Sequence, residues 1–405
     1  MVEPDTSFEL VDTREAYLDA LERLRAGTGP VGVDAERASG YRYFQNAYLI
    51  QVYREGSGTF LFDPPALGAD LSELGDVLAD EEWILHAASQ DLACLREVSM
   101  DPERIFDTEL AARLLGLPRV GLGAVVEELL GIHLAKEHSA ADWSTRPLPA
   151  SWLVYAALDV DLLPRLREAM VDLLEKADKA EIAAQEFQAT LDRQPKAALP
   201  EPWRRLSGLN TLRGARNLAA ARELWHTRDA LARERDVSPG RLVPDASLVA
   251  AAKALPESKA ALAGMREFSG RASRSELDRW WEAIAEARVT EDLPAPRLRS
   301  AEPTMPPPRA WADRNPEADA RLKHARLALV ARAEKLDMPL ENLLTPELLR
   351  RVAWRPPTVL DSAHIGVALA ELGARPWQVD ATAEPIAEAF VAALQGPPSV
   401  PETDS

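Results

Sequence analysis

Four acidic residues and a tyrosine have the types and spacing that metal-dependent phosphodiester hydrolysis requires. Asp34 and Glu36 lie in VGVDAER, Asp91 lies in ILHAASQDLACL, and Tyr155 and Asp159 lie in LVYAALDVDLLPRL. Each group falls where a buried apolar element should end or expose one face, so the carboxylates can converge on one cleft. A cleft of this kind could hold divalent cations that activate water.

The first pair follows a short apolar run, Val31 to Val33, that predicts a buried strand. Side chains on a strand alternate between its faces, so Asp34 and Glu36 point the same way. Two carboxylates on one face repel each other and lose hydration unless a cation lies between them. A solvated pair at a strand end is the other interpretation, and this motif alone does not decide between the two.

The third group lies on a predicted helix, because residues 150–174 carry apolar side chains at a helical period. Tyr155 and Asp159 are four residues apart and share one helix face. Tyr155 is either an ordinary half-buried tyrosine or, beside metal ions, a residue that holds or deprotonates a water molecule. Asp161 lies on a different face and is interpreted as solvated.

Asp91 is expected in the first turn of a helix over 90–98, which follows a short buried strand over 83–86. An aspartate there is either a favourable partner of the helix dipole or a fourth ligand. The other candidates are hard oxygen donors suited to Mg²⁺ or Mn²⁺. His86 is therefore interpreted as an orienting or core residue.

These segments together resemble the ribonuclease D group of the DEDDy 3′–5′ exonucleases. The stretches FDTELAARLLG from Phe106 and ADWSTRPLP from Ala141 are also typical of that group, and the resemblance extends over essentially the whole chain. Tyr155 occupies the position at which a second group of related exonucleases carries a histidine, so the resemblance excludes that group. The resemblance implies a ribonuclease-H-like fold and a catalytic set of Asp34, Glu36, Asp91, Tyr155 and Asp159.

The same resemblance implies a metal-dependent 3′–5′ exoribonuclease that trims the 3′ ends of structured RNA such as tRNA precursors. The four carboxylates would hold two divalent ions, Mg²⁺ or Mn²⁺, and the products would be nucleoside 5′-monophosphates. A DNA-directed exonuclease of the same chemistry and an inactive RNA-binding protein are the alternatives. No obligatory protein partner is evident. Additional nucleic-acid contacts are expected from Tyr41, Arg42, Arg213 and Arg216.

Proline-rich stretches divide the chain. PKAALPEPW, from Pro195, ends an exonuclease domain over residues 1–195, and the similar all-helical modules that follow resemble HRDC (helicase and RNase D C-terminal) domains. We expect the first HRDC-type domain over 204–293, a Pro-rich linker over 294–308, a second, divergent HRDC-type domain over 309–396 and a flexible tail over 397–405. A faint repeat at an offset of 101 residues aligns Asp236-Val237 with Asp337-Met338.

The fold class is therefore an α/β ribonuclease-H-like nuclease domain, with a mixed sheet flanked by helices, followed by two all-helical domains. The expected elements begin with a helix from Phe8 to Leu24, capped by Asp12 or Thr13. Strands are expected at 31–36, 47–53, 59–62 and 83–86, and helices at 71–78, 92–98, 108–115 and 122–130.

The net charge of −18 is unusual for an enzyme that acts on nucleic acid, but its distribution is uneven. Residues 1–195 contain 17 Lys and Arg against 36 Asp and Glu, whereas residues 196–300 contain 19 against 14. The middle of the chain is thus the expected place for phosphate contacts. Without an apolar stretch long enough to span a membrane or a secretory leader, the expected location is the cytoplasm.

Overall fold

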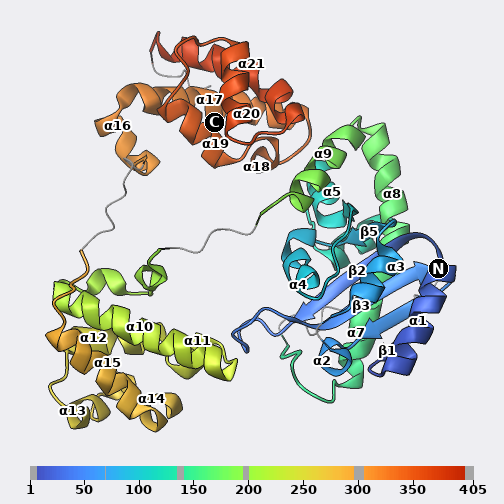
Figure 1. Cartoon of the computed structure of the whole chain (residues 1–405). Helices are drawn as coiled ribbons and strands as arrows, with labels where there is room; N and C mark the ends of the chain where they lie inside the picture. Colours follow the sequence, from blue (N-terminus) through green and yellow to red (C-terminus); the bar gives the residue numbers. More distant parts are fainter. Residues whose placement is uncertain (1–6, 69, 135–140, 195–199, 296–304, 397–405) are drawn as a thin grey trace.

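The computed structural model describes residues 7–68, 70–134, 141–194, 200–295 and 305–396, which form an α/β part and two helical bundles (Figure 1). We call the helices of residues 202–289 the first bundle and those of residues 308–393 the second bundle. The predicted tail over 397–405 and residues 296–304 of the predicted linker lie outside the described residues. The domain boundaries themselves stay predictions.

A six-stranded mixed sheet forms the centre of the α/β part, as expected. Its order is β1-β4-β3-β2-β5-β6, with β3 antiparallel to both of its neighbours and the other pairs parallel. The strands are β1 Glu9–Val11, β2 Thr28–Arg37, β3 Ala47–Glu55, β4 Gly58–Phe62, β5 Glu82–Leu85 and β6 Arg104–Asp107.

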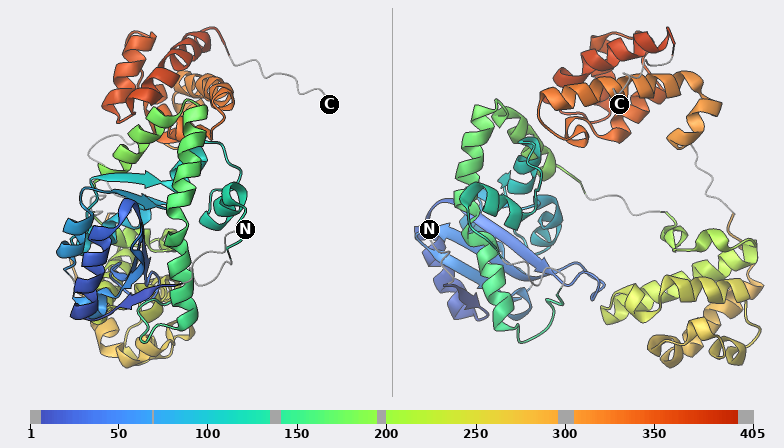
Figure 2. Two further views of the ribbon diagram at one scale, coloured as in Figure 1. Left: turned by 90° about the vertical axis from the view of Figure 1, so that its right-hand side faces the viewer. Right: turned by 180° about the vertical axis from the view of Figure 1, so that it is seen from behind.

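Helices cover the sheet on both sides (Figures 1 and 2). One side carries α7, which packs on β2, β3 and β4, and α8, which packs on β2 and β5. The helices of this part are α1 Arg14–Ala26, α2 Pro64–Leu67, α3 Ser72–Leu78, α4 Leu92–Glu97, α5 Thr108–Leu114, α6 Leu122–Leu130, α7 Ala150–Asp161, α8 Leu163–Lys176 and α9 Ala180–Leu191.

The predicted start of the N-terminal helix, at Phe8, was wrong. Residues Glu9–Val11 form β1, an edge strand that pairs with β4, and α1 begins only at Arg14. Thr13 is the N-cap, and its hydroxyl accepts a hydrogen bond from the backbone N–H of Ala16 at 3.3 Å. A strand of three residues is too short to show an alternating pattern, so its type depends on the partner strand.

The single helix expected over 150–174 is two helices, α7 and α8, which meet at Leu162. Pro164 explains the break, because proline lacks a backbone N–H and its ring clashes with the carbonyl four residues earlier. That residue is Val160, whose carbonyl oxygen points instead toward β2. A Cβ atom added to Gly32 of β2 would lie 2.7 Å from this oxygen.

The two bundles repeat one arrangement. Each long helix, α10 Ala215–Arg235 or α17 Pro316–Lys335, ends next to an aspartate with φ of 46°, Asp236 or Asp337. The helices that follow are α11 Pro239–Leu242, α12 Asp245–Ala254, α13 Lys259–Ala263, α14 Arg271–Ser275 and α15 Leu277–Val289 in the first bundle. In the second, α16 Trp311–Arg314 precedes α17, and α18 Leu340–Leu343, α19 Pro346–Trp354, α20 Ser362–Glu371 and α21 Pro376–Ala393 follow it.

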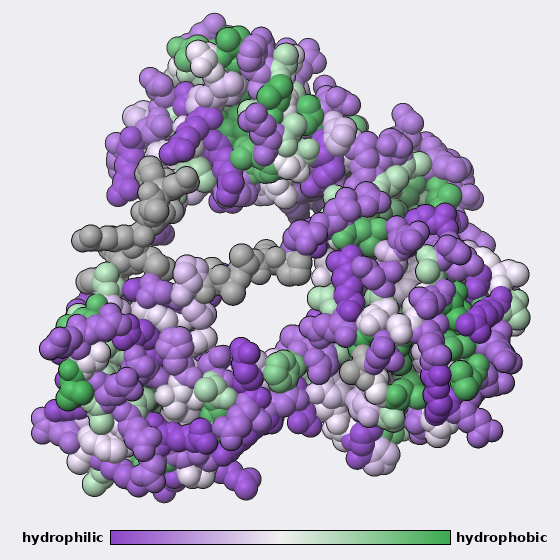
Figure 3. Space-filling view, viewed as in Figure 1, coloured by the Kyte–Doolittle hydropathy of each residue, from purple (hydrophilic) through white to green (hydrophobic). Residues whose placement is uncertain are grey.

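Both bundles contact the α/β part, although they look like separate, mostly hydrophilic lobes in the space-filling view (Figure 3). The buried core of the second bundle is continuous with that of the α/β part, whereas the first bundle has a core of its own. Within the described residues, no helix has the length and apolar character needed to cross a membrane.

Candidate metal and nucleic-acid site

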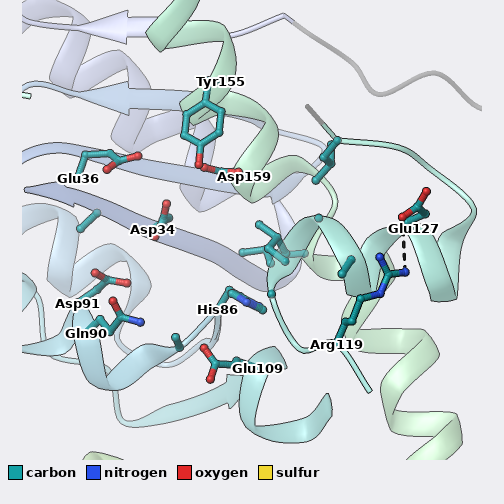
Figure 4. A pocket seen from close by; sticks show the side chains of 18 of the residues that line it. Asp34, Glu36, His86, Gln90, Asp91, Glu109, Arg119, Glu127, Tyr155 and Asp159 are labelled. Atoms are coloured by element: carbon teal, nitrogen blue, oxygen red, sulfur yellow. Dashed lines mark ion pairs between the residues drawn. The ribbon is translucent and has the colours of Figure 1, made fainter. Parts of the chain in front are cut away.

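Three of the predicted carboxylates meet in the structure. One oxygen from each of Asp34, Glu36 and Asp159 lies within 4.8 Å of the others, close enough to share a cation. Asp34 and Glu36 are two residues apart on β2 and project from the same face, and Asp159 comes from α7 on that face (Figure 4). The short separation of α7 and β2 at Gly32 is what brings the two elements together.

Asp91 lies beside this group rather than in it. It is buried at the N-terminus of α4, and its carboxyl group shares a hydrogen bond with that of Asp34. Arg37, one residue beyond Glu36, lies 3.4 Å from Asp91 and supplies a positive charge at the edge of the cluster. A fourth carboxylate is thus available to a second cation.

Tyr155 reaches the cluster from α7, one turn before Asp159, and its phenol donates a hydrogen bond to the Asp159 carboxylate (Figure 4). Burial and the neighbouring negative charges raise the pKa of Tyr155. The phenol therefore stays protonated at neutral pH and can orient a water molecule without acting as a base.

Burial is the first cause of raised pKa values throughout the cluster. It raises the pKa of Asp34 to about 6. Burial and then repulsion by Asp34 raise the pKa of Asp91 to about 8 and that of Glu36 to about 10. The pKa of Asp159 rises for the same two reasons. Carboxyls with raised pKa values can exchange their protons for divalent cations, which prefer oxygen ligands.

All five predicted residues line one pocket of about 940 Å³ (Figure 4). Its opposite wall contains residues that the sequence patterns did not single out: Glu109, Arg119, Glu127, His133 and the start of α6 at Gly121–Ala124. Glycines at the start of a predicted helix were the available signal, because a helix N-terminus without bulky side chains can approach a ligand closely.

Tyr41 and Arg42, predicted to contact nucleic acid, make contacts within the protein. Arg241 of the first bundle stacks 3.8 Å from the Tyr41 ring centre, and the Tyr41 carbonyl accepts a hydrogen bond from the backbone N–H of Ser238 at 2.9 Å. The Arg42 Nε donates to the Ser144 hydroxyl at 2.8 Å. Their role toward nucleic acid stays a prediction.

Of the two predicted arginines in the first bundle, Arg213 is exposed, whereas Arg216 is hydrogen-bonded inside the bundle. The Arg216 guanidinium donates to the carbonyl oxygens of Ala287 and Thr290 at the end of α15. It therefore joins α10 to α15, and of the two, Arg213 is the better placed for phosphate.

Comparison with known families divides the chain in the same order. Residues 8–175 match the 3′–5′ exonuclease family, residues 217–284 the HRDC domain, and residues 304–390 the 3′ to 5′ exonuclease C-terminal domain. The third match does not test whether the second bundle is of HRDC type, which stays a prediction.

Similar proteins include ribonuclease D of Gluconacetobacter diazotrophicus, 30% identical over 355 residues that cover 86% of each chain. Ribonuclease D of Escherichia coli is 31% identical over 62% of this chain and 68% of its own. Its crystal structure, titled as an exoribonuclease involved in structured RNA processing, superposes with a TM-score of 0.66 at 26% identity, covering 90% of this chain and 98% of that one. A protein from Bifidobacterium adolescentis superposes with a TM-score of 0.86 at 37% identity over 96% and 99% of the two chains.

Proposed function

The chain belongs to the ribonuclease D family of 3′–5′ exoribonucleases, and we propose that it trims structured RNA precursors in the pocket that Asp34, Glu36 and Asp159 share. The observation that carries this proposal is the convergence of those three carboxylates, from β2 and α7, with Asp91 hydrogen-bonded to Asp34 beside them. RNA is the substrate, and the family and the acidic cluster together indicate dependence on a divalent metal.

The donor set fits two ions of the Mg²⁺ or Mn²⁺ type, because every candidate ligand is a carboxylate oxygen. Asp34, Glu36, Asp91 and Asp159 would hold them. When bound, such ions supply an activated water and neutralise the charge that develops on the scissile phosphate and the leaving 3′ oxygen.

The protein's own groups have complementary tasks. The Tyr155 phenol, protonated and next to Asp159, orients the attacking water toward the phosphate. The Arg37 guanidinium, at 3.4 Å from Asp91, limits the repulsion between the carboxylates and an approaching RNA strand. Each cleavage would release a nucleoside 5′-monophosphate and leave an RNA shorter by one nucleotide.

Among structured RNA precursors, those of transfer RNA are the proposed substrates. The support is the similarity to Escherichia coli ribonuclease D, which is described as an exoribonuclease involved in structured RNA processing. The first bundle contacts the segment that follows Glu36. From there it could hold the folded part of such an RNA while the 3′ end enters the pocket.

Digestion of a 3′-extended tRNA precursor by wild type and Asp159→Asn, in Mg²⁺, Mn²⁺ or EDTA, tests this proposal. We expect stepwise 3′ shortening that needs the metal and falls by at least about 10³-fold in the variant. Asp161→Asn is the matched control, because Asp161 ends the same helix but does not line the pocket. Near-full metal-dependent activity in Asp159→Asn would place the reaction elsewhere.

A further inference from the structure

His86 lines the same pocket and has no task in the reaction as described so far. It directly follows β5, where the chain turns through Ala87, a residue with φ of 64°. The Asp107 carboxylate fixes this turn by accepting hydrogen bonds from the backbone N–H groups of Ala87 at 3.1 Å and Ala88 at 2.9 Å. Figure 4 shows the imidazole among the pocket-lining side chains. Its position is therefore built into the fold.

Hydrogen bonds identify which nitrogen of His86 carries the proton. The hydroxyl of Thr108, a fully buried residue, donates to the carbonyl oxygen of Leu85 at 3.1 Å. A threonine hydroxyl has one hydrogen, and when that hydrogen is directed at the Leu85 carbonyl, its oxygen is the acceptor in the 2.9 Å contact with His86 Nδ1. We therefore assign the proton to Nδ1, which leaves Nε2 with a free electron pair.

This state persists at neutral pH. Burial lowers the pKa of His86 to about 4, with smaller and opposing effects from Glu109 and Arg113. The Glu109 carboxylate is itself held by Arg113 through bonds of 2.7 and 2.8 Å. His86 therefore presents a neutral imidazole with one hydrogen-bond acceptor.

A hydrogen-bond acceptor at this position can bind only those groups of an RNA 3′ end that donate a hydrogen bond. Phosphate oxygens carry no hydrogen at neutral pH and cannot donate to it. The group of atoms close enough to share a cation comprises Asp34, Glu36 and Asp159, so within the described residues the imidazole stands outside it. The nearest donors to a phosphate held at those carboxylates are the hydroxyl groups of the adjoining riboses, and the 2′-hydroxyl is the one that distinguishes RNA from DNA.

We propose that the Nε2 atom of His86 accepts a hydrogen bond from the 2′-hydroxyl of a nucleotide at the substrate's 3′ end, and so favours RNA over DNA. This inference rests on the proposed function, because it requires the 3′ end to occupy the carboxylate pocket. His86 is then a residue that determines specificity, and Thr108 positions it by fixing its tautomer.

The first test compares wild type with His86→Phe, which keeps a ring but removes the acceptor, on RNA and all-2′-deoxy oligonucleotides of one sequence. We expect kcat/KM for RNA to fall about 10-fold, the loss of one neutral hydrogen bond, and that for DNA to stay within about 2-fold. His364→Phe is the matched control, since His364 is an exposed histidine of the second bundle that does not line the pocket. An equal fall on both substrates, or no fall, would overturn the inference.

Asp34→Asn, assayed in parallel, separates the two possible failures. If Asp34→Asn is inactive while His86→Phe keeps the wild-type ratio of RNA to DNA cleavage, the site is right and the role of His86 is wrong. If Asp34→Asn remains active, the proposed site itself is wrong.

A second test observes the tautomer without any substrate. In long-range ¹H–¹⁵N spectra of protein with labelled histidines, the signal missing from His86→Phe should show a protonated Nδ1 and an unprotonated Nε2. Thr108→Ser should keep this pattern and the preference for RNA, whereas Thr108→Val should lose both. A wild-type signal with the proton on Nε2 would contradict the proposal directly.

Discussion

At the scale of single residues, the cluster of carboxyl groups destabilises the folded protein when no metal is bound. The buried Asp91 and the half-buried Asp34 share a hydrogen bond between their carboxyl groups, and Glu36 and Asp159 lie nearby. Charged carboxylates so close together lose hydration and repel one another, so protons or cations must compensate them. Stability should therefore depend on both pH and metal.

We predict that the free energy of unfolding in EDTA falls as pH rises from 5 to 8. The raised pKa values, about 6 for Asp34 and about 8 for Asp91, mean that the folded protein keeps protons that the unfolded chain loses near pH 4. Their contribution is fully present below about pH 4 and is lost as pH rises toward 6 for Asp34 and toward 8 for Asp91, on the order of several kcal/mol. Urea unfolding at several pH values measures it.

Two controls isolate the carboxyl groups from the rest of the protein. Asp34→Asn combined with Asp91→Asn should reduce the pH dependence in EDTA, and the part that remains comes from Glu36 and Asp159, whose pKa values burial also raises. Saturating Mn²⁺ should reverse it in wild type, because an ion binds the deprotonated carboxylates and competes with protons. A wild-type stability in EDTA that rises between pH 5 and 8 would contradict the assigned pKa directions.

The spacing of the acidic residues predicted their convergence, because strand and helix periods fix which side chains share a face. Tyr41 and Arg42 show that residue spacing does not predict contacts between distant parts of the chain. Tyr41 contacts Arg241, 200 residues further along the chain, and Arg42 contacts Ser144. Local patterns contain no information about such distant partners, so an aromatic–basic pair in a loop looks the same in either role. The tautomer of His86 is also beyond the sequence, since it depends on Leu85 and Thr108 together.

At the scale of elements, most strands and helices were predictable where apolar periodicity extended over five or more residues. β3 and β4 lie within two residues of their expected bounds, and α6 occupies the expected 122–130. β6, at Arg104–Asp107, was missed because its two apolar residues, Ile105 and Phe106, are adjacent and lie between charged residues, which shows neither an alternation nor an apolar run. Pro164 indicated the break before α8. The break was missed because the apolar helical period continues on both sides of this proline.

The close contact between β2 and α7 is testable through Gly32→Ala. The added Cβ would lie 2.7 Å from the Val160 carbonyl oxygen, so the end of α7 must shift away from the sheet. We expect a loss of about 1–3 kcal/mol in stability, and a lower metal affinity because Asp159 moves from Asp34. Gly240→Ala is the matched control, since its Cβ would meet nothing within 4 Å. Thermal unfolding and Mn²⁺ titration measure both effects, and unchanged metal affinity would show that the spacing is not set there.

At the scale of the whole molecule, the two bundles contact the α/β part through corresponding turns. The Asp236 carboxylate accepts hydrogen bonds from the backbone N–H groups of Tyr43 at 3.0 Å and Phe44 at 3.1 Å. At the equivalent place in the second bundle, the backbone oxygen of Asp337 accepts from Lys179 Nζ at 3.0 Å. The repeat is consistent with a duplicated helical unit that kept the position of its contact.

Asp236→Gly should therefore weaken the contact between the first bundle and the α/β part. Glycine tolerates the φ of 46° at this position, so the change removes the carboxylate without straining the turn. We expect a larger radius of gyration in solution scattering and about 10-fold weaker binding of structured RNA, with short oligonucleotides cleaved normally. Asp337→Gly is the control, because it keeps the backbone oxygen. Unchanged scattering in Asp236→Gly would mean that other contacts hold the bundle.

Anomalous diffraction from crystals soaked in Mn²⁺ would show whether the carboxylate pocket holds divalent ions for RNA cleavage. We predict two anomalous peaks in the pocket, bound by Asp34, Glu36, Asp91 and Asp159, both lost when Asp34→Asn crystals are soaked in the same way. A single peak would contradict the two-ion arrangement. The absence of any peak at these carboxylates in wild-type crystals would contradict both the metal site and the proposed reaction.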